Sequence, residues 1–250
     1  MSELSPRRSV TSHAPVDCSA TPALAGIDGC HDGWVVVSEI RGALSAWIAT
    51  TIAELDARLP APARVAIDIP IGLPQQQRRS CEVLARRLLG APRSTSVFPV
   101  PARPCLAATS HSDASRINHA LTGRRLSIQS WAIMPKIREV DAYVRHADRA
   151  HDLTEIHPEV SFAAWNGLKA MRHSKHSREG RLERAQLIDT LWPGGPDRLW
   201  AALDGRAQRD DLYDAFAALW TARRLARDTA VSLPAQPEHD SMGLSMCISY

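Results

Sequence analysis

Three apolar runs near the start of the chain are separated by short turns. Residues 23–28 (ALAGID), 34–40 (WVVVSEI) and 43–50 (ALSAWIAT) are rich enough in apolar and β-branched residues to form strands. The segments GCHDG and Arg41-Gly42 between them are typical of tight turns. Connections this short predict three consecutive antiparallel strands. The next segment, 51–59 (TIAELDARL), keeps helical spacing and predicts a helix.

A fourth apolar run has a different pattern. Residues 65–69 (VAIDI) are apolar on both faces, as in a buried parallel strand, and Pro70 ends the run. A meander, a helix and a buried strand together favour an α/β fold with a mixed sheet, in which the fourth strand lies parallel to the first. Residues 153–162 (LTEIHPEVSF) resume a strand pattern, with Glu155, His157 and Glu159 alternating on one face.

The remaining segments indicate how the chain is organised. Residues 75–150 interrupt the α/β pattern with two helical stretches, and Pro135 predicts a kink or break in the second. A segment this long exceeds an ordinary crossover and predicts an inserted helical lobe or lid. The folded domain is expected over residues 23–228, with a flexible arm at 1–22 and a flexible tail at 229–250, where periodicity is absent.

Composition narrows the class of protein. The 250 residues are 44% hydrophobic and 23% charged, which is typical of soluble globular proteins. No run approaches the roughly 18 apolar residues of a membrane span, and the N-terminus has no signal-peptide core. Five scattered cysteines, none in a C-x-x-C pair, predict reduced thiols and a cytoplasmic protein. A net charge of +3 does not by itself indicate a nucleic-acid binder.

Four acidic residues stand where a metal site is expected. Asp28 and Asp68 come at the carboxyl ends of two strands predicted to be parallel neighbours, which is where open α/β sheets place ligands. Asp211 and Asp214 are adjacent on a helix surface and border a strip of small residues that includes Ala215. Oxygen ligands of this kind suit Mg²⁺ or Mn²⁺ rather than zinc.

Each acid also has a plainer interpretation. Asp28 can be a turn residue beside Gly29, and Asp211 can belong to the first turn of its helix, where acids are favoured. Asp68, which comes shortly before Pro70, and Asp214, which lies beyond the first turn, are harder to explain in this way. Together the four acids favour a site for one or two divalent cations, the arrangement used in phosphoryl transfer.

Basic residues offer candidate phosphate contacts. Residues 171–186 (MRHSKHSREGRLERAQ) carry His173 and Lys175 in a loop that leads into a helix, and Lys136 and Arg138 lie in MPKIREVD. The alternative for both segments is an ordinary solvated helix face. His157 is either a general base or a histidine with a structural hydrogen bond. Phosphate contacts of this kind supply affinity rather than sequence specificity.

Several motifs, taken together, resemble one family. GIDGCHDGW, VAIDIPIGLP, SVFPVPAR, LSIQSWAIMPKIREVD, EIHPEVSF, HSKHSREGRLER and DDLYDAFAALWTA are similar, in this order, to the predicted RNase H-like nucleases, a widespread bacterial family. The resemblance implies an RNase H-like five-stranded mixed sheet, with three antiparallel strands and then two parallel ones, flanked by helices and interrupted by the helical insertion between strands 4 and 5. It implies catalytic acids at Asp28, Asp68 and Asp214, with Asp211 beside the last. We expect Glu159 or Asp211 to complete the metal shell.

The sequence therefore predicts a metal-dependent nuclease that hydrolyses phosphodiester bonds with Mg²⁺ or Mn²⁺. Its partner is expected to be nucleic acid or another phosphate-containing substrate. No association with a membrane is expected. Two alternatives remain open at this point. One is a phosphotransferase or nucleotide hydrolase on the related actin-like core, and the other is a non-catalytic nucleic-acid-binding or regulatory protein on the same scaffold.

Overall fold

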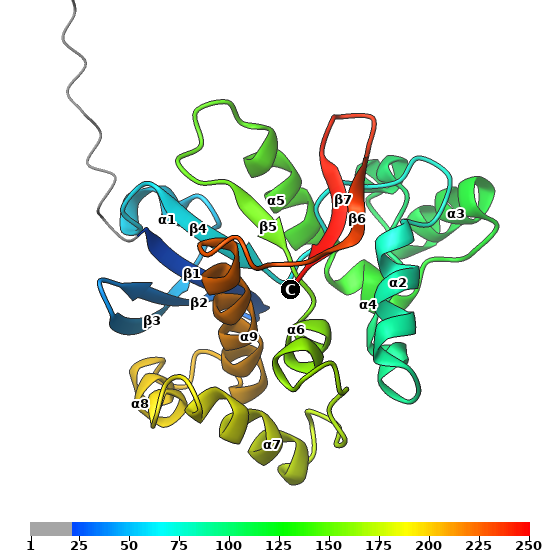
Figure 1. The fold of residues 1–250 in the computed structure, drawn as a ribbon. Coiled ribbons are helices and arrows are strands. Elements are labelled where there is room, and N and C mark those ends of the chain that lie inside the picture. The colour runs from blue at the N-terminus through cyan, green and yellow to red at the C-terminus, as the bar shows by residue number, and fades with distance from the viewer. Residues whose placement is uncertain (1–21) are drawn as a thin grey trace, which may run out of the picture.

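A five-stranded mixed sheet forms the centre of the molecule in the computed structural model, which describes residues 22–250 (Figure 1). The strand order is β3-β2-β1-β4-β5. The strands are β1 (Ala23–Cys30), β2 (Gly33–Ile40), β3 (Ala43–Ala49), β4 (Ala63–Ile67) and β5 (Leu153–Glu155). The first three pair antiparallel, whereas β1 with β4 and β4 with β5 pair parallel. This confirms the predicted sheet. The expected arm falls, apart from residue 22, outside the described residues.

Helix α9 (Arg209–Leu225) covers one face of the sheet and approaches β1 closely. A Cβ atom on Gly26 would lie 2.0 Å from the backbone nitrogen of Leu219 and 2.1 Å from the carbonyl oxygen of Ala215. Only glycine fits there, because no real Cβ atom approaches backbone so closely. Ala215 and Ala218 are fully buried at the contact. The strip of small residues therefore brings the middle of α9 against the middle of β1.

The opposite face of the sheet is covered by α1 (Glu54–Arg58) and α5 (Met134–Arg145). Ile137 and Val140 of α5 are fully buried and pack with Ile27 of β1 and Val36 of β2. Successive residues of β1 thus contribute to two different apolar layers, as the two-residue repeat of a strand requires. The result is a sheet held between two layers of helices, with β1 at its centre.

The chain between β4 and β5 is helical, as expected. It contains α2 (Ser80–Leu89), the 3₁₀ turns η1 (Arg93–Ser96) and η2 (Arg103–Ala107), α3 (His111–Thr122) and α4 (Ile128–Ala132), and it ends with α5. Pro135 stands in the first turn of α5, where its missing N–H costs no hydrogen bond. It therefore separates α4 from α5, which is the predicted break.

The prediction of a strand over residues 153–162 is wrong for most of this segment. β5 ends at Glu155, and α6 (Pro158–Trp165) begins three residues later, with His157 as its N-cap residue. Pro158 at the first helical position favours this start. Glu155 does not share a face with Glu159, since both of its carboxylate oxygens lie 2.7 Å from the buried guanidinium of Arg79. Helices α7 (Arg178–Asp189) and α8 (Gly195–Ala202) follow and pack on the α9 side.

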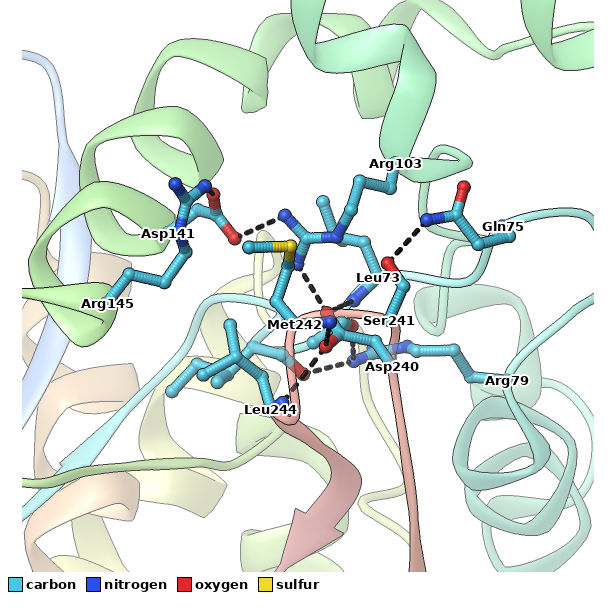
Figure 2. Close-up of polar contacts among 12 residues, drawn as sticks. Leu73, Gln75, Arg79, Arg103, Asp141, Arg145, Asp240, Ser241, Met242 and Leu244 are labelled. Atoms are coloured by element: carbon cyan, nitrogen blue, oxygen red, sulfur yellow. Dashed lines mark hydrogen bonds and ion pairs between the residues drawn. The ribbon is translucent and has the colours of Figure 1, made fainter.

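The C-terminal residues are ordered, which corrects the expectation of a flexible tail at 229–250. They form a hairpin of β6 (Ser232–His239) and β7 (Ser245–Ser249) that packs against α2 and runs beside β5 (Figure 1). Figure 2 shows how the hairpin tip is held. Asp240 accepts hydrogen bonds from the backbone N–H of Leu73, 2.9 Å away, and from the guanidinium of Arg103. Arg103 in turn contacts Asp141 of α5 at 2.8 Å.

Candidate functional site

A cavity of about 580 Å³ lies at the carboxyl ends of β1 and β4. Most of the residues that the sequence singles out contribute to its wall. These are Asp28, Asp68, Lys136, His157, Glu159, Lys175 and Asp214. They come from two strand ends, from the helices α5, α6 and α9 and from the loop before α7. The predicted site therefore forms as one concave feature, built from segments up to 186 residues apart in the chain.

Three separate elements supply the acids of the cavity. Asp28 lies near the end of β1 and is 8% exposed. Asp68 directly follows β4, and its N–H donates to the carbonyl of Ile27 at 2.9 Å, which extends the parallel pairing by one residue. Asp214, 2% exposed, precedes the alanine that covers Gly26. The close approach of α9 to β1 thus brings the Asp214 carboxylate to the strand ends.

These carboxylates lie close to one another, and this proximity raises the pKa values of two of them. Burial, together with the charges of Asp68 and Asp214, raises the pKa of Asp28 well above its ordinary value. Burial and the charge of Asp214 raise the pKa of Asp68 to about 8. Lys175 is the cation nearest to the cluster, with its Nζ 2.5 Å from Oδ2 of Asp214, and the charge of Asp214 raises the pKa of this lysine. One ammonium group does not balance three carboxylates.

Glu159 lies in the first turn of α6 and is 6% exposed. Its Oε1 accepts a hydrogen bond from Arg184, whose side chain is fully buried. Its Oε2 is buried and has no hydrogen-bond partner within the described part of the chain. Burial raises the pKa of Glu159. The residue therefore combines a structural ion pair with one carboxylate oxygen left for another donor or a cation.

His157 links the acid cluster to the loop around η1. Its Nε2 lies 3.3 Å from the carbonyl oxygen of Ser96. Because a carbonyl only accepts hydrogen bonds, Nε2 carries the proton and Nδ1 is an acceptor. Nδ1 is buried and has no partner among residues 22–250. Burial lowers the pKa of His157 to about 4, so the ring is neutral at pH 7.

Lys136 lies at the edge of the cavity. Its Nζ donates to the carbonyl of Gly33 at 2.5 Å and lies 4.5 Å from the centre of the Trp34 ring. The ammonium group is thus held over the β1–β2 turn by one hydrogen bond and a cation–π contact. It adds a second positive charge beside the cavity, in addition to that of Lys175.

Three predicted site residues are not part of the cavity wall. Arg138 donates to the carbonyl oxygens of Leu106 and Ala108, so its guanidinium holds the insertion rather than a substrate. His173 is exposed. Asp211 accepts from the backbone N–H of Gln208 at 2.9 Å and so caps α9, which is the plainer interpretation of this acid. For Arg138 and Asp211, an ordinary structural contact replaces the expected role.

The sequence interpretation missed several residues that line the same cavity. Arg93, Ser96 and Phe98 come from η1 and the residues after it, and Ser174 precedes Lys175. The segment around η1 is rich in proline and has no periodicity, so no pattern predicted where its side chains point. Two motifs of the family resemblance were the available signals: SVFPVPAR, which contains Ser96 and Phe98, and HSKHSREGRLER, which contains Ser174.

The donor chemistry of the cavity fits a hard cation. Asp28, Asp68 and Asp214 offer only oxygen ligands, and their mutual repulsion favours any added positive charge. Glu159, whose buried Oε2 has no hydrogen-bond partner among residues 22–250, also lines this cavity. Across residues 22–250, no group of three or more His, Cys, Asp and Glu side chains is already arranged as a metal cage. The oxygen ligands of these acids are therefore of the type that Mg²⁺ or Mn²⁺ prefers. Binding of such an ion requires the carboxylate side chains to move closer together.

Comparison with known proteins identifies the family. Residues 26–239 match the family described as "Protein of unknown function (DUF429)", and the chain belongs to this family. No curated protein and no solved structure matches the chain. In the part of the chain that the structure describes, none of the helices combines the length and the apolar character needed to cross a bilayer.

Proposed function

We propose that this member of the DUF429 family is an RNase H-like nuclease that hydrolyses phosphodiester bonds of nucleic acid with a bound divalent cation. One observation carries the proposal. Three carboxylates from β1, the end of β4 and α9 meet in one cavity, beside the ammonium groups of Lys175 and Lys136. Acids whose pKa values are raised by burial and by neighbouring charges, and which lie in a cavity, are candidates for catalytic groups.

The charges of the cluster favour a single divalent ion. Asp28, Asp68 and Asp214 carry three negative charges when ionised. Lys175 supplies one positive charge in direct contact with them, whereas the ammonium of Lys136 is held on Gly33 and Trp34 and is not counted here. One Mg²⁺ or Mn²⁺ balances the remaining two, whereas two such ions would leave a positive excess. A bound ion of this type polarises a phosphoryl oxygen and lowers the pKa of water, which is the chemistry that phosphodiester hydrolysis needs.

The other groups of the cavity have roles that follow from their contacts. The ammonium groups of Lys175 and Lys136 attract the negative phosphate backbone and hold it beside the acids. The neutral ring of His157 presents Nδ1 as an acceptor for a hydroxyl or a water molecule. With a pKa of about 4, this ring orients a donor at pH 7 and does not serve as a general acid.

A cleavage screen tests the proposal. Labelled single-stranded, double-stranded and branched DNA and RNA are incubated with the protein and Mg²⁺ or Mn²⁺, and products are separated by size. We expect metal-dependent cleavage that EDTA abolishes. Asp28→Asn is expected to lose at least about 10³-fold in rate, because several kcal/mol of transition-state stabilisation depend on the ion.

Arg138→Gln is the matched control, since this side chain contacts carbonyls of the insertion and not the cavity. It is expected to keep a rate close to that of the parent protein. Full activity in a folded Asp28→Asn protein would contradict the proposal. Nucleotide-dependent thermal stabilisation without cleavage would instead favour a phosphotransferase or nucleotide hydrolase, and nucleic-acid binding that survives EDTA without turnover would favour a binding protein.

A further inference from the structure

One aromatic side chain of the protein is unlike the others. The chain has three Phe, seven Trp and three Tyr residues, all within the described part. Twelve of them are buried or half-buried, whereas Phe98 is 47% exposed. Phe98 lines the cavity that holds the acid cluster. Phe98 therefore offers an accessible aromatic ring in the wall of the candidate site, on which a ligand with a flat face can stack.

The surroundings of Phe98 are those of a small-molecule pocket. Pro92 and Pro99 lie in the same wall and fix the course of the loop after α2. The Nε atom of Arg93 is buried without a hydrogen-bond partner among residues 22–250, and this residue also lines the cavity. The wall around η1 therefore joins an exposed ring, rigid backbone and one unsatisfied donor.

His157 places an unsatisfied acceptor between this wall and the acids. It lines the cavity, and its Nε2 donates to Ser96 of η1, which leaves Nδ1 buried with no partner. A buried nitrogen that accepts no hydrogen bond costs free energy unless a ligand supplies the donor. A sugar hydroxyl or a base amino group has the required chemistry. The acceptor is thus an observation independent of the acid cluster, and it also points to a ligand.

We infer that the cavity holds one nucleotide unit in single-stranded form, with its base stacked on Phe98 and its phosphate directed to the acid cluster. The inference rests on the proposed function and specifies its substrate class. The cavity, about 580 Å³, has the size of a small-ligand pocket rather than of a duplex-binding groove. Bases inside a double helix are covered by their neighbours, so only an unpaired base has a free face to offer Phe98.

Equilibrium binding tests the inference without any turnover, because nucleoside monophosphates contain no diester. Uridine 5′-monophosphate and ribose 5-phosphate, which carry a base and a hydroxyl respectively at the anomeric carbon, are titrated in Mg²⁺ by calorimetry. The parent protein is expected to bind the nucleotide at least about fivefold more tightly, since stacking of a base on an aromatic residue contributes that much or more. Phe98→Ala should remove this preference, and Phe98→Trp should retain it.

Leu182→Ala is the control, because Leu182 is 51% exposed on α7 and does not line the cavity. It should leave the preference unchanged, and thermal melting checks that every variant is folded. Equal affinity for the two ligands, an unchanged preference in Phe98→Ala, or no binding of either ligand would overturn the inference. A second comparison uses a single-stranded oligonucleotide and a blunt duplex of the same sequence as competitors. Equal competition by the duplex would also overturn it.

The outcome is separable from that of the proposed function. If the protein cleaves nucleic acid in the metal-dependent screen but shows no preference for the ligand with a base, only the inference about the nucleotide pocket is contradicted. A protein that binds uridine 5′-monophosphate through Phe98 but cleaves nothing with Mg²⁺ or Mn²⁺ retains the nucleotide pocket and loses the nuclease proposal.

Discussion

Aspartate carboxylates lie at two places in this protein, the tip of the C-terminal hairpin and the cavity, and the two places differ in the groups that surround the carboxylate. At the hairpin tip, Asp240 accepts hydrogen bonds from the N–H groups of Leu73 and Leu244 and from Arg103 (Figure 2). Burial opposes its ionisation, yet these donors hold the pKa of Asp240 below its ordinary value. In the cavity, burial and mutual repulsion hold the pKa of Asp28 and Asp68 above theirs.

The direction of the pKa shift distinguishes Asp240, a structural acid, from Asp28 and Asp68, which are candidate functional acids. Asp240 is surrounded by donors, so its negative charge stabilises the fold, and no further ligand is needed. Asp28 and Asp68 face other carboxylates, so their charges destabilise the fold until a cation is added. An acid cluster that remains short of positive charge in the folded protein is the kind of site at which a metal ion binds and chemistry follows.

Removing the structural acid is expected to have the larger effect on stability. Asp240→Ala leaves Arg103 with Asp141 alone and frees the backbone N–H groups of Leu73 and Leu244. We expect a loss of about 2–4 kcal/mol in the free energy of unfolding, because a partly buried charge and buried donors lose their partner. Urea denaturation measures this loss.

Asp148→Ala serves as the control for this substitution, since Asp148 is an exposed acid. Its effect should stay within about 0.5 kcal/mol, as for most surface substitutions. If the two variants unfold at the same urea concentration, the hairpin tip is not held by Asp240, and the contrast between the two places fails.

The pH dependence of stability should have opposite signs at the two places. The pKa of Asp68 is about 8 in the folded protein and near 3.8 when unfolded, so its contribution is fully present below about pH 4 and is lost as the pH rises through 8. Asp240, with a lowered pKa, contributes above 3.8, and its contribution is lost as the pH falls.

Asp68→Asn isolates the first of these contributions. In EDTA, this variant should gain stability relative to the parent protein as the pH is raised from 5 to 9, by roughly 1–3 kcal/mol after allowance for solvent screening. Thermal unfolding across this range measures the difference. A constant difference between the two proteins at all pH values would mean that the cavity acids are not crowded in the way their pKa values indicate.

The fold and the position of the acids could be predicted because they depend on local patterns. Alternating and fully apolar runs indicated the strands, and the two-residue repeat placed Asp28 and Asp68 on one face of neighbouring parallel strands. The small side chains at Ala215 and Ala218 indicated a close helix–sheet contact, which Gly26 completes. Each of these inferences uses information within a few residues of the position concerned.

The errors concern contacts made over long distances in the chain. The hairpin sequence SLPAQPEH has little apolar character, and its order depends on partners such as Arg103, more than 130 residues away. Similarly, Arg138 has the residue type of a phosphate ligand, but its guanidinium is directed to the carbonyl oxygens of Leu106 and Ala108. The exposure of Phe98 in a proline-rich loop has no periodic signal at all.

The central claim is that the cavity acids are short of one divalent cation, and a titration with Mn²⁺ tests it most directly. Calorimetry of the parent protein, Asp28→Asn and Asp240→Asn gives the number of ions and their affinity. We expect one Mn²⁺ per chain in the parent protein and in Asp240→Asn, and an affinity at least about tenfold weaker in Asp28→Asn. Absence of Mn²⁺ binding, or binding that Asp28→Asn leaves unchanged, would contradict the claim.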